Sequence, residues 1–572
     1  AAEGKPVIVC NCQAGWQIMM MAAIRPDLVG PIVLAGSPLS YWAGVRGRNP
    51  MRYTGGTLGG TWLTALTGDM GNGIFDGAHL VSNFESLNPA NTYWEKDYNL
   101  YSKVDTEAHR FLEFEAWWGS PVLLNAVEMQ WIADNLFVGN KLTSGEIRTS
   151  DGVRVDLRNI RSPIIVLCSW GDNITPPQQA LGWVTDLYGH EDEIVANGQT
   201  IVYTLHQSIG HLGIFVSGKV ATKEHAEFAS CMEMIDLMPP GLYEAVITEV
   251  DQDTANPELI HGKYLFKLEA RSLDDIRALG ANSDDDNQRF AAVARVSEVN
   301  HGLYRTFVQP AVRAMTTEQS AEMARQLHPN RLRFTMFSDK NPMMQPVKAL
   351  AEQVRADRKP VAPDNPLLTL EHVASTWITT WWEGYRQARD AMTEAMFLGV
   401  YGSPLLQAMV GLGTQHAPTE RRIDRELLRE VDEARMSVEL ERRFEVGGLP
   451  QAVLRALIYV RFPQRSVDER GFAALQAIRA MQPANDRMST AELKACLKEQ
   501  FLLVRLDEER AVRAIPQLLP ESEHVRRTAL DALRQVVGAY GALPEDGLRR
   551  LGRVETLFGV IGDEQRLKAA NA

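Results

Sequence analysis

The chain lacks long apolar runs, has few cysteines and carries no surplus of basic residues, and each shortage excludes a class of protein. No apolar run reaches the roughly eighteen residues of a transmembrane helix, and no signal-peptide pattern opens the sequence. The five cysteines are scattered and odd in number, which argues against a disulfide framework and indicates a reducing compartment, here the cytoplasm. A formal net charge of -13 leaves no basic surplus to neutralise phosphates, which argues against a nucleic-acid partner.

Metal-binding patterns are also missing. No Cys/His spacing typical of a zinc site occurs, and Cys10 and Cys12 are too close in sequence to form half of one. The sequence therefore predicts no metal centre and no cofactor. The 572 residues, 45% of them hydrophobic and 23% charged, are ordinary for globular proteins and predict about three or four domains.

The first chemically informative stretch combines a strand, a sharp turn and a helix. The apolar run at 6–10 is typical of a buried parallel strand, and an apolar pattern of helical period then continues to Ala23. Between them lies Cys12, and a thiol at a strand–helix turn is the setting of a nucleophile elbow. Ala14 and Gly15 supply the small side chains that such a tight turn needs.

The elbow also predicts which neighbours of Cys12 matter. The backbone N–H of the next residue, Gln13, would form half of an oxyanion hole. Cysteine is also among the most often buried residue types, so inert packing is the alternative role for Cys12. We assign that packing role to Cys10.

Two later strand patterns each end near a residue that could act as the acid or the base beside a thiol nucleophile. The apolar run at 30–36 completes a strand–helix–strand unit, which predicts a parallel sheet. The run at 162–169 leads to Asp172, and the run at 199–205 leads to His211. Both residues would lie past the carboxyl ends of their strands, where open α/β sheets hold their ligands.

The chain order Cys12, Asp172, His211 is the nucleophile–acid–histidine order of α/β-hydrolases. The imidazole would accept the thiol proton, and the carboxylate would orient the ring and stabilise the imidazolium. A strand-end Asp often only caps the next helix, and a loop His is usually solvated. Three such residues on suitable elements together predict a catalytic triad. His206 belongs to the strand itself and is expected to pack or hydrogen-bond locally.

These motifs resemble those of the polyhydroxyalkanoate synthases. The segment Cys10–Gly15 is similar to their elbow, Asp172–Pro176 to their acid motif, and Gly210–Ile214 to their histidine motif. The resemblance covers residues 5 to about 220, and the chain as a whole looks like a poorly characterised group of long bacterial synthase-like proteins. It implies acyl transfer through a Cys12 thioester, with Asp172 and His211 as partners and an acyl-coenzyme A type hydroxyacyl thioester as substrate.

The expected fold class is α/β plus all-α. We expect an α/β-hydrolase-type domain at 1–240, with an aromatic-rich cap at about 37–160 inserted over the sheet edge, and a β-hairpin linker at 241–284. Helical patterns then fill 285–419 and 420–572.

Three stretches of the helical half each leave an alternative open. The aromatic residues of 367–402 indicate a core-facing helix, with attachment to a polymer granule surface or protein partner as the alternative. The stretch 420–445 is charge-dense, typical of a solvated helix or short coiled coil. The last region is similar to helical bundles of the tellurite-resistance type, which would make the acidic stretch Leu506–Arg510 a metal-binding position. An ordinary solvated helix face is the alternative there.

The resemblance implies that the chain begins inside the catalytic domain, so its N-terminal part is expected to be lacking. We accordingly expect an incomplete sheet of about four parallel strands, with Val7–Cys10 unpaired on one side. For function, acyl transfer is favoured over thioester or ester hydrolysis by the same triad. A catalytically idle hydrolase fold that serves as a scaffold for helical partners is the third hypothesis.

Overall fold

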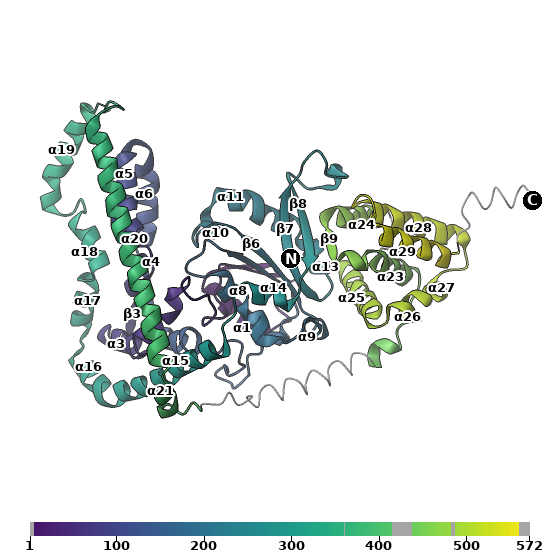
Figure 1. Ribbon diagram of the computed structural model, residues 1–572, viewed down its shortest axis with the longest axis horizontal. Helices are drawn as coiled ribbons and strands as arrows, with labels where there is room; N and C mark the ends of the chain where they lie inside the picture. Colours follow the sequence, from purple (N-terminus) through teal and green to yellow (C-terminus); the bar gives the residue numbers. More distant parts are fainter. Residues whose placement is uncertain (1–4, 360, 414–437, 482–486, 560–572) are drawn as a thin grey trace, which may run out of the picture. The chain divides into compact units, whose positions relative to one another are not determined.

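The computed structural model describes residues 5–359, 361–413, 438–481 and 487–559 (Figure 1). The chain divides into two compact units. The first contains residues 1–40, 142–280 and 417–572, and the second contains 41–141 and 281–416. Each unit is described here by itself.

A mixed sheet forms the centre of the first unit. Its strands lie in the order β1 (Ile8–Asn11), β2 (Ile32–Ala35), β5 (Ile164–Ser169), β6 (Thr200–His206), β7 (Gly241–Glu249), β8 (Tyr264–Ala270) and β9 (Ser466–Asp468). The strands from β1 to β7 pair in parallel, whereas β8 runs antiparallel to both β7 and β9. The expected α/β class with additional helices is confirmed.

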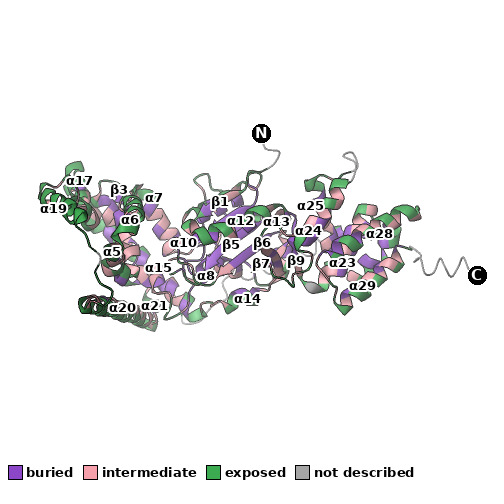
Figure 2. Ribbon diagram, turned by 90° about the horizontal axis from the view of Figure 1, so that it is seen from above, coloured by how far each residue is buried: buried purple, intermediate pink, exposed green. Residues whose placement is uncertain are grey.

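The central strands are buried on both faces, as continuous apolar runs predict. Every residue of β2 and β5 is buried (Figure 2). Alternate strand residues, such as Val33 and Ile165, join a core with helices α12 (Ala226–Ser230) and α13 (Met232–Leu237). This two-sided covering is typical of parallel sheets.

The sheet is larger than expected. The prediction of about four parallel strands is wrong, because five pair in parallel and two antiparallel strands extend the sheet. The run at 241–249 continues the parallel sheet next to β6, and the run at 264–270 returns antiparallel to it. Strand β1 lies at one edge and pairs with β2 alone among the described residues, and Val9 there is 65% exposed.

Helices of the C-terminal region complete the first unit. They are α23 (Leu449–Arg461), α24 (Glu469–Met481), α25 (Thr490–Leu506), α26 (Glu508–Arg513), α27 (Ile515–Leu518), α28 (Glu523–Gly538) and α29 (Glu545–Leu557). Buried residues of α23, α28 and α29, among them Val460, Leu533 and Val554, form a shared core. Between α23 and α24 the chain extends as β9, which pairs with β8 at the register Leu268↔Val467. The bundle is therefore joined to the sheet through backbone hydrogen bonds.

The second unit combines the aromatic-rich segment with the first helical region. Tyr53 and Phe397 lie 4.5 Å apart between ring centroids, and Phe290 stacks on Tyr53. The indole N–H of Trp94 donates to the hydroxyl of Ser375 at 2.9 Å. Much of the predicted cap therefore shares a core with residues beyond 281. Its predicted position over the sheet edge stays a prediction.

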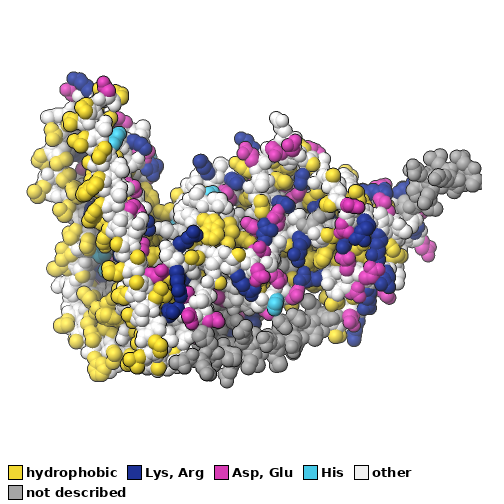
Figure 3. Space-filling model, viewed as in Figure 1, with side chains coloured by type: hydrophobic (Ala, Val, Ile, Leu, Met, Phe, Trp, Pro, Cys, Tyr) yellow, Lys and Arg dark blue, Asp and Glu magenta, His cyan; other side chains and the backbone are white. Residues whose placement is uncertain are grey.

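The long helix α20 (Pro366–Tyr401) is less buried than predicted. Phe397 and Tyr401 are buried, but Trp377 is 68% exposed and Met392 is 70% exposed. The prediction of a core-facing helix is wrong for most of its apolar side chains, because only its C-terminal turns meet the core of the unit. Figure 3 shows hydrophobic side chains gathered along this part of the molecule.

Two further predictions concern membrane-spanning helices and the charge-dense stretch 420–445. Within the described ranges, no helix combines the length and the apolar character needed to span a bilayer. Residues 420–437 of the predicted charge-dense helix lie outside the part of the chain that the structure describes.

Candidate functional site

Cys12 lies at a strained turn between strand β1 and helix α1 (Ala14–Ile24). Its φ angle is 50°, in the left-handed region that non-glycine residues rarely adopt. The backbone N–H of Cys12 donates to the carbonyl of Ala35 at 2.9 Å, and its carbonyl accepts from the N–H of Gly15 at 3.1 Å. The side chain of Cys12 is half-buried. This is the backbone geometry that a nucleophile elbow requires.

The elbow depends on the missing side chain of Gly15. A Cβ atom placed there would lie 2.3 Å from the Ser37 hydroxyl and 3.3 Å from Leu34. Helix α1 therefore lies so close to the end of strand β2 that no side chain fits between them at position 15. The small residues expected after the thiol have a direct steric reason.

His211 and Asp172 meet beyond the carboxyl ends of their strands. His211 follows β6, Asp172 follows β5, and His211 Nδ1 lies 2.7 Å from Asp172 Oδ2. Both side chains are buried, at 6% and 2% exposure. The edge of the His211 ring packs against Phe215, with the ring centroids 5.1 Å apart.

The carboxylate of Asp172 is held from its other side by backbone donors. Its Oδ1 atom accepts from the N–H groups of Ile174 at 2.9 Å and Thr175 at 2.8 Å. The residue therefore orders its own loop and contacts the histidine as well. It does not cap helix α8 (Pro177–Leu187), whose N-cap residue is Pro176 and has no side-chain cap hydrogen bond.

Both Asp172 and Cys12 affect the pKa of His211. Burial disfavours the imidazolium, but the hydrogen bonds with Asp172 and Cys12 outweigh that penalty and raise the pKa of His211 to about 9. Because Nδ1 faces Asp172, Nε2 is the ring nitrogen left for Cys12. The structure thus brings His211 and Asp172 into contact, and the effect of Cys12 on the pKa of His211 places the thiol near the ring.

The remaining predicted residues have local roles. Cys10 is buried within β1, and burial raises the pKa of its thiol. His206 Nδ1 accepts from the N–H groups of Ser208 and Ile209, so this ring orders the loop before His211. The side chain of Gln13 accepts from the indole N–H of Trp16 at 2.9 Å. An oxyanion-hole role for the Gln13 N–H stays a prediction.

Sequence reasoning missed Ser169, the last residue of β5. Its fully buried hydroxyl donates to the carbonyl of Ile209 at 2.6 Å and accepts from the N–H of Gly171 at 3.1 Å. These bonds join the loop that carries Asp172 to the loop that carries His211. A serine at a strand end is too common to signal such a bridge in advance.

A cavity of about 710 Å³ in the first unit is separate from these residues. It lies among β7, β8 and the C-terminal helices, and its walls include Tyr243, Phe472, Phe501 and Tyr540. Cys12, Asp172 and His211 do not line it. The cavity is therefore not the site where the reacting group of a Cys12 substrate binds.

The acidic stretch at 506–510 is engaged in intramolecular contacts. Asp507 caps helix α26 by accepting from the N–H of Arg510 at 2.9 Å. Glu508 pairs with Arg550 at 2.9 Å, and Glu509 pairs with Arg553 at 2.6 Å. Arginine partners thus occupy the two glutamates of the predicted metal-binding position, which favours the alternative of an ordinary helix face.

Comparison with known proteins assigns the chain to a family. The model of the family described as "Protein of unknown function (DUF3141)" matches residues 1–444, and the chain belongs to this family. A Rhizobium meliloti protein described as an uncharacterized protein in the ackA 5' region is 52% identical over 562 residues. That alignment covers 98% of this chain and 77% of the Rhizobium protein.

More distant similarity links part of the chain to polyhydroxyalkanoate synthases. The poly(3-hydroxyalkanoate) polymerase subunit PhaC of Synechocystis is 28% identical over 225 residues, covering 38% of this chain and 55% of that protein. The subunit of the same name from Allochromatium vinosum is 27% identical over 218 residues, covering 37% and 55%. The chain spans about half the length of these two polymerase subunits. No solved structure matches the chain.

Proposed function

We propose that this member of the DUF3141 family is an acyltransferase that forms a thioester on Cys12 from hydroxyacyl thioesters. The observation that supports the proposal is the contact of the His211 ring with Asp172 through Nδ1, close to a thiol held at a strained strand–helix turn. The partial similarity to poly(3-hydroxyalkanoate) polymerase subunits supports the substrate class.

The chemistry would begin with proton transfer. Nε2 of the neutral form of His211 accepts the thiol proton, and Asp172 stabilises the imidazolium that forms. Because the pKa of His211 is raised to about 9, the neutral form that can act as base increases as pH rises towards that value. The Cys12 thiolate attacks the thioester carbonyl carbon, and the Gln13 N–H donates to the resulting oxyanion. When the tetrahedral intermediate collapses, the carbon–sulfur bond of the substrate breaks and the departing thiolate takes the proton from His211. The acyl group is then bound to Cys12.

The second half-reaction decides the class of enzyme. If the hydroxyl group of another hydroxyacyl unit attacks the Cys12 thioester, an ester bond forms and the acyl chain grows. If water attacks instead, the product is a free hydroxy acid and the protein is a thioesterase. In both cases His211 accepts the proton of the attacking hydroxyl group and returns it to the Cys12 sulfur.

The test is to trap the acyl-enzyme on the whole chain. We expect incubation with a 3-hydroxyacyl-coenzyme A to add one acyl mass, located on Cys12 by peptide mass spectrometry. Cys12→Ala should abolish the adduct, and Cys10→Ala, a matched change on the adjacent strand, should retain it. Labelling on Cys10 or equal loss in both variants would contradict the proposal.

Product analysis separates the remaining hypotheses. Polymer or oligomer supports acyl transfer, whereas free hydroxy acid alone would replace it with hydrolysis by the same triad. A folded chain that neither acylates nor releases coenzyme A would favour the catalytically idle scaffold and overturn the proposal.

A further inference from the structure

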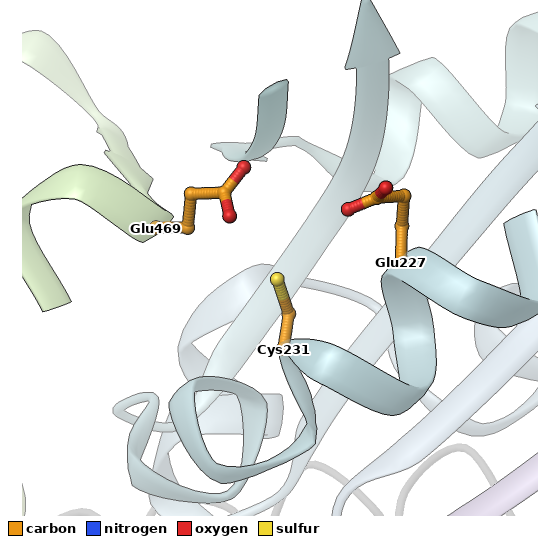
Figure 4. Close-up of side chains that lie close together, drawn as sticks. All are labelled: Glu227, Cys231 and Glu469. Atoms are coloured by element: carbon orange, nitrogen blue, oxygen red, sulfur yellow. The ribbon is translucent and has the colours of Figure 1, made fainter. Parts of the chain in front are cut away.

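Three buried side chains, two of them four residues apart and the third more than two hundred residues later, converge at a place separate from Cys12, Asp172 and His211. Glu227 lies on α12, Cys231 follows that helix, and Glu469 is the first residue of α24. One ligand atom from each residue lies within 4.8 Å of the other two. Figure 4 shows the three side chains pointing into a common space from two separate segments. None of them takes part in the proposed reaction at Cys12.

The carboxylate of Glu227 has an unsatisfied oxygen. The residue is only 4% exposed, and its Oε2 atom is fully buried with no hydrogen-bond partner among the described residues. Buried carboxylate oxygens almost always have a partner, because desolvating them without one is costly. Burial and the nearby Glu469 carboxylate also raise the pKa of Glu227 to about 7. A cation would supply the missing partner.

Glu469 is fixed in place by backbone donors. Its Oε1 atom accepts from the N–H of Phe266 at 2.9 Å, and its Oε2 atom accepts from the N–H of His261 at 3.0 Å. Each carboxylate oxygen has a second lone pair that these bonds do not use. Glu469 is therefore oriented in advance and can still bind an ion.

We propose that Glu227, Cys231 and Glu469 bind a divalent transition-metal ion, with Zn²⁺ the best match. A thiol beside two carboxylates favours zinc over Ca²⁺ or Mg²⁺, which take oxygen ligands only. In a tetrahedral site, zinc–ligand bonds of about 2.0 to 2.3 Å place the ligand atoms about 3.3 to 3.8 Å apart, so a contraction of at most about 1.5 Å would close the site.

Binding would change the protonation of the site. The Cys231 thiol loses its proton to solvent and its sulfur bonds to the ion, as metal thiolates require. A water molecule would take the fourth position. Because the site is buried and joins α12 to the start of α24, its role would be structural, holding the helical bundle against the sheet.

The test uses the whole chain freed of metal by a chelator. We expect calorimetry and metal analysis to find one Zn²⁺ per chain, with proton release and a higher melting temperature. Cobalt should give a sulfur-to-metal charge-transfer absorption, a readout on the unmodified protein that needs no variant. Cys231→Ser and Glu227→Gln should each weaken binding by about tenfold or more. The matched controls Cys496→Ser and Glu233→Gln should bind like the parent chain.

Three outcomes would overturn the site. The first is a folded parent chain that takes up no stoichiometric zinc. The second is unchanged affinity in both Cys231→Ser and Glu227→Gln. The third is a parent chain whose stability does not change with zinc, together with a Glu227→Gln variant that is more stable than this parent. That result would mean that Glu227 and Glu469 share a proton and bind no ion.

Discussion

Asp172 Oδ2 and His211 Nδ1 lie 2.7 Å apart although 39 residues separate them in the chain. The contact arises because β5 and β6 are parallel neighbours, so the loops that follow them leave the sheet at the same edge. The bond between Ser169 and Ile209 holds those two loops together. Asp172 thereby fixes the orientation of the imidazole ring.

The first prediction concerns this contact. Asp172→Asn keeps an acceptor for the backbone N–H groups of Ile174 and Thr175 but removes the charge that faces His211. We expect acylation of Cys12 to slow by about 10²- to 10⁴-fold, as in other triads that lose the acid, and the pKa of His211 to fall. Single-turnover acylation and NMR titration of the ring measure the two effects. Unchanged acylation would show that Asp172 only orders its loop.

The second prediction concerns pH. The pKa of His211 is raised from 6.5 to about 9 in the folded chain, so the protonated ring stabilises the fold. That contribution, about 3 kcal/mol from the size of the shift, is fully present below pH 6.5 and is lost as pH rises through about 9. Denaturant unfolding across this window should show the loss in the parent chain and in His206→Gln. An identical slope in His211→Gln would contradict the assignment.

The third prediction concerns the elbow. In Gly15→Ala the new methyl group would meet the Ser37 hydroxyl at 2.3 Å, so helix α1 or the end of β2 must move. We expect a loss of about 1 to 3 kcal/mol in unfolding free energy and slower acylation of Cys12. Gly218→Ala is the matched control, because nothing lies within 4 Å of a Cβ atom at that helical position. Equal stability of the two variants would refute the close approach.

The fourth prediction separates the two faces of α20. Phe397 is buried against Tyr53 and Phe290, so Phe397→Ala should cost about 3 to 5 kcal/mol of stability in the second unit. Trp377 on the same helix is 68% exposed, and Trp377→Ala should change stability by less than about 0.5 kcal/mol. Thermal unfolding of both variants provides the comparison. A large loss from Trp377→Ala would mean that another surface covers this side chain.

The sequence by itself determined the local elements and the composition of the candidate site. Apolar runs placed β1, β2, β5 and β6 within about two residues of their observed bounds, because a buried parallel strand leaves a continuous local signal. The positions of Asp172 and His211 after such strands also predicted their contact. Parallel strands bring their carboxyl ends to one edge whatever the length of the intervening chain.

Only the tertiary structure decided the long-range partnerships. The three residues of β9 are too short a run to signal a strand, and they gain their hydrogen bonds from β8 about two hundred residues earlier. The same holds for the core shared by Tyr53 and Phe397 and for the cluster of Glu227, Cys231 and Glu469. Such contacts depend on chain topology. A local sequence pattern predicts that a side chain is buried, but it does not predict which distant residues that side chain contacts.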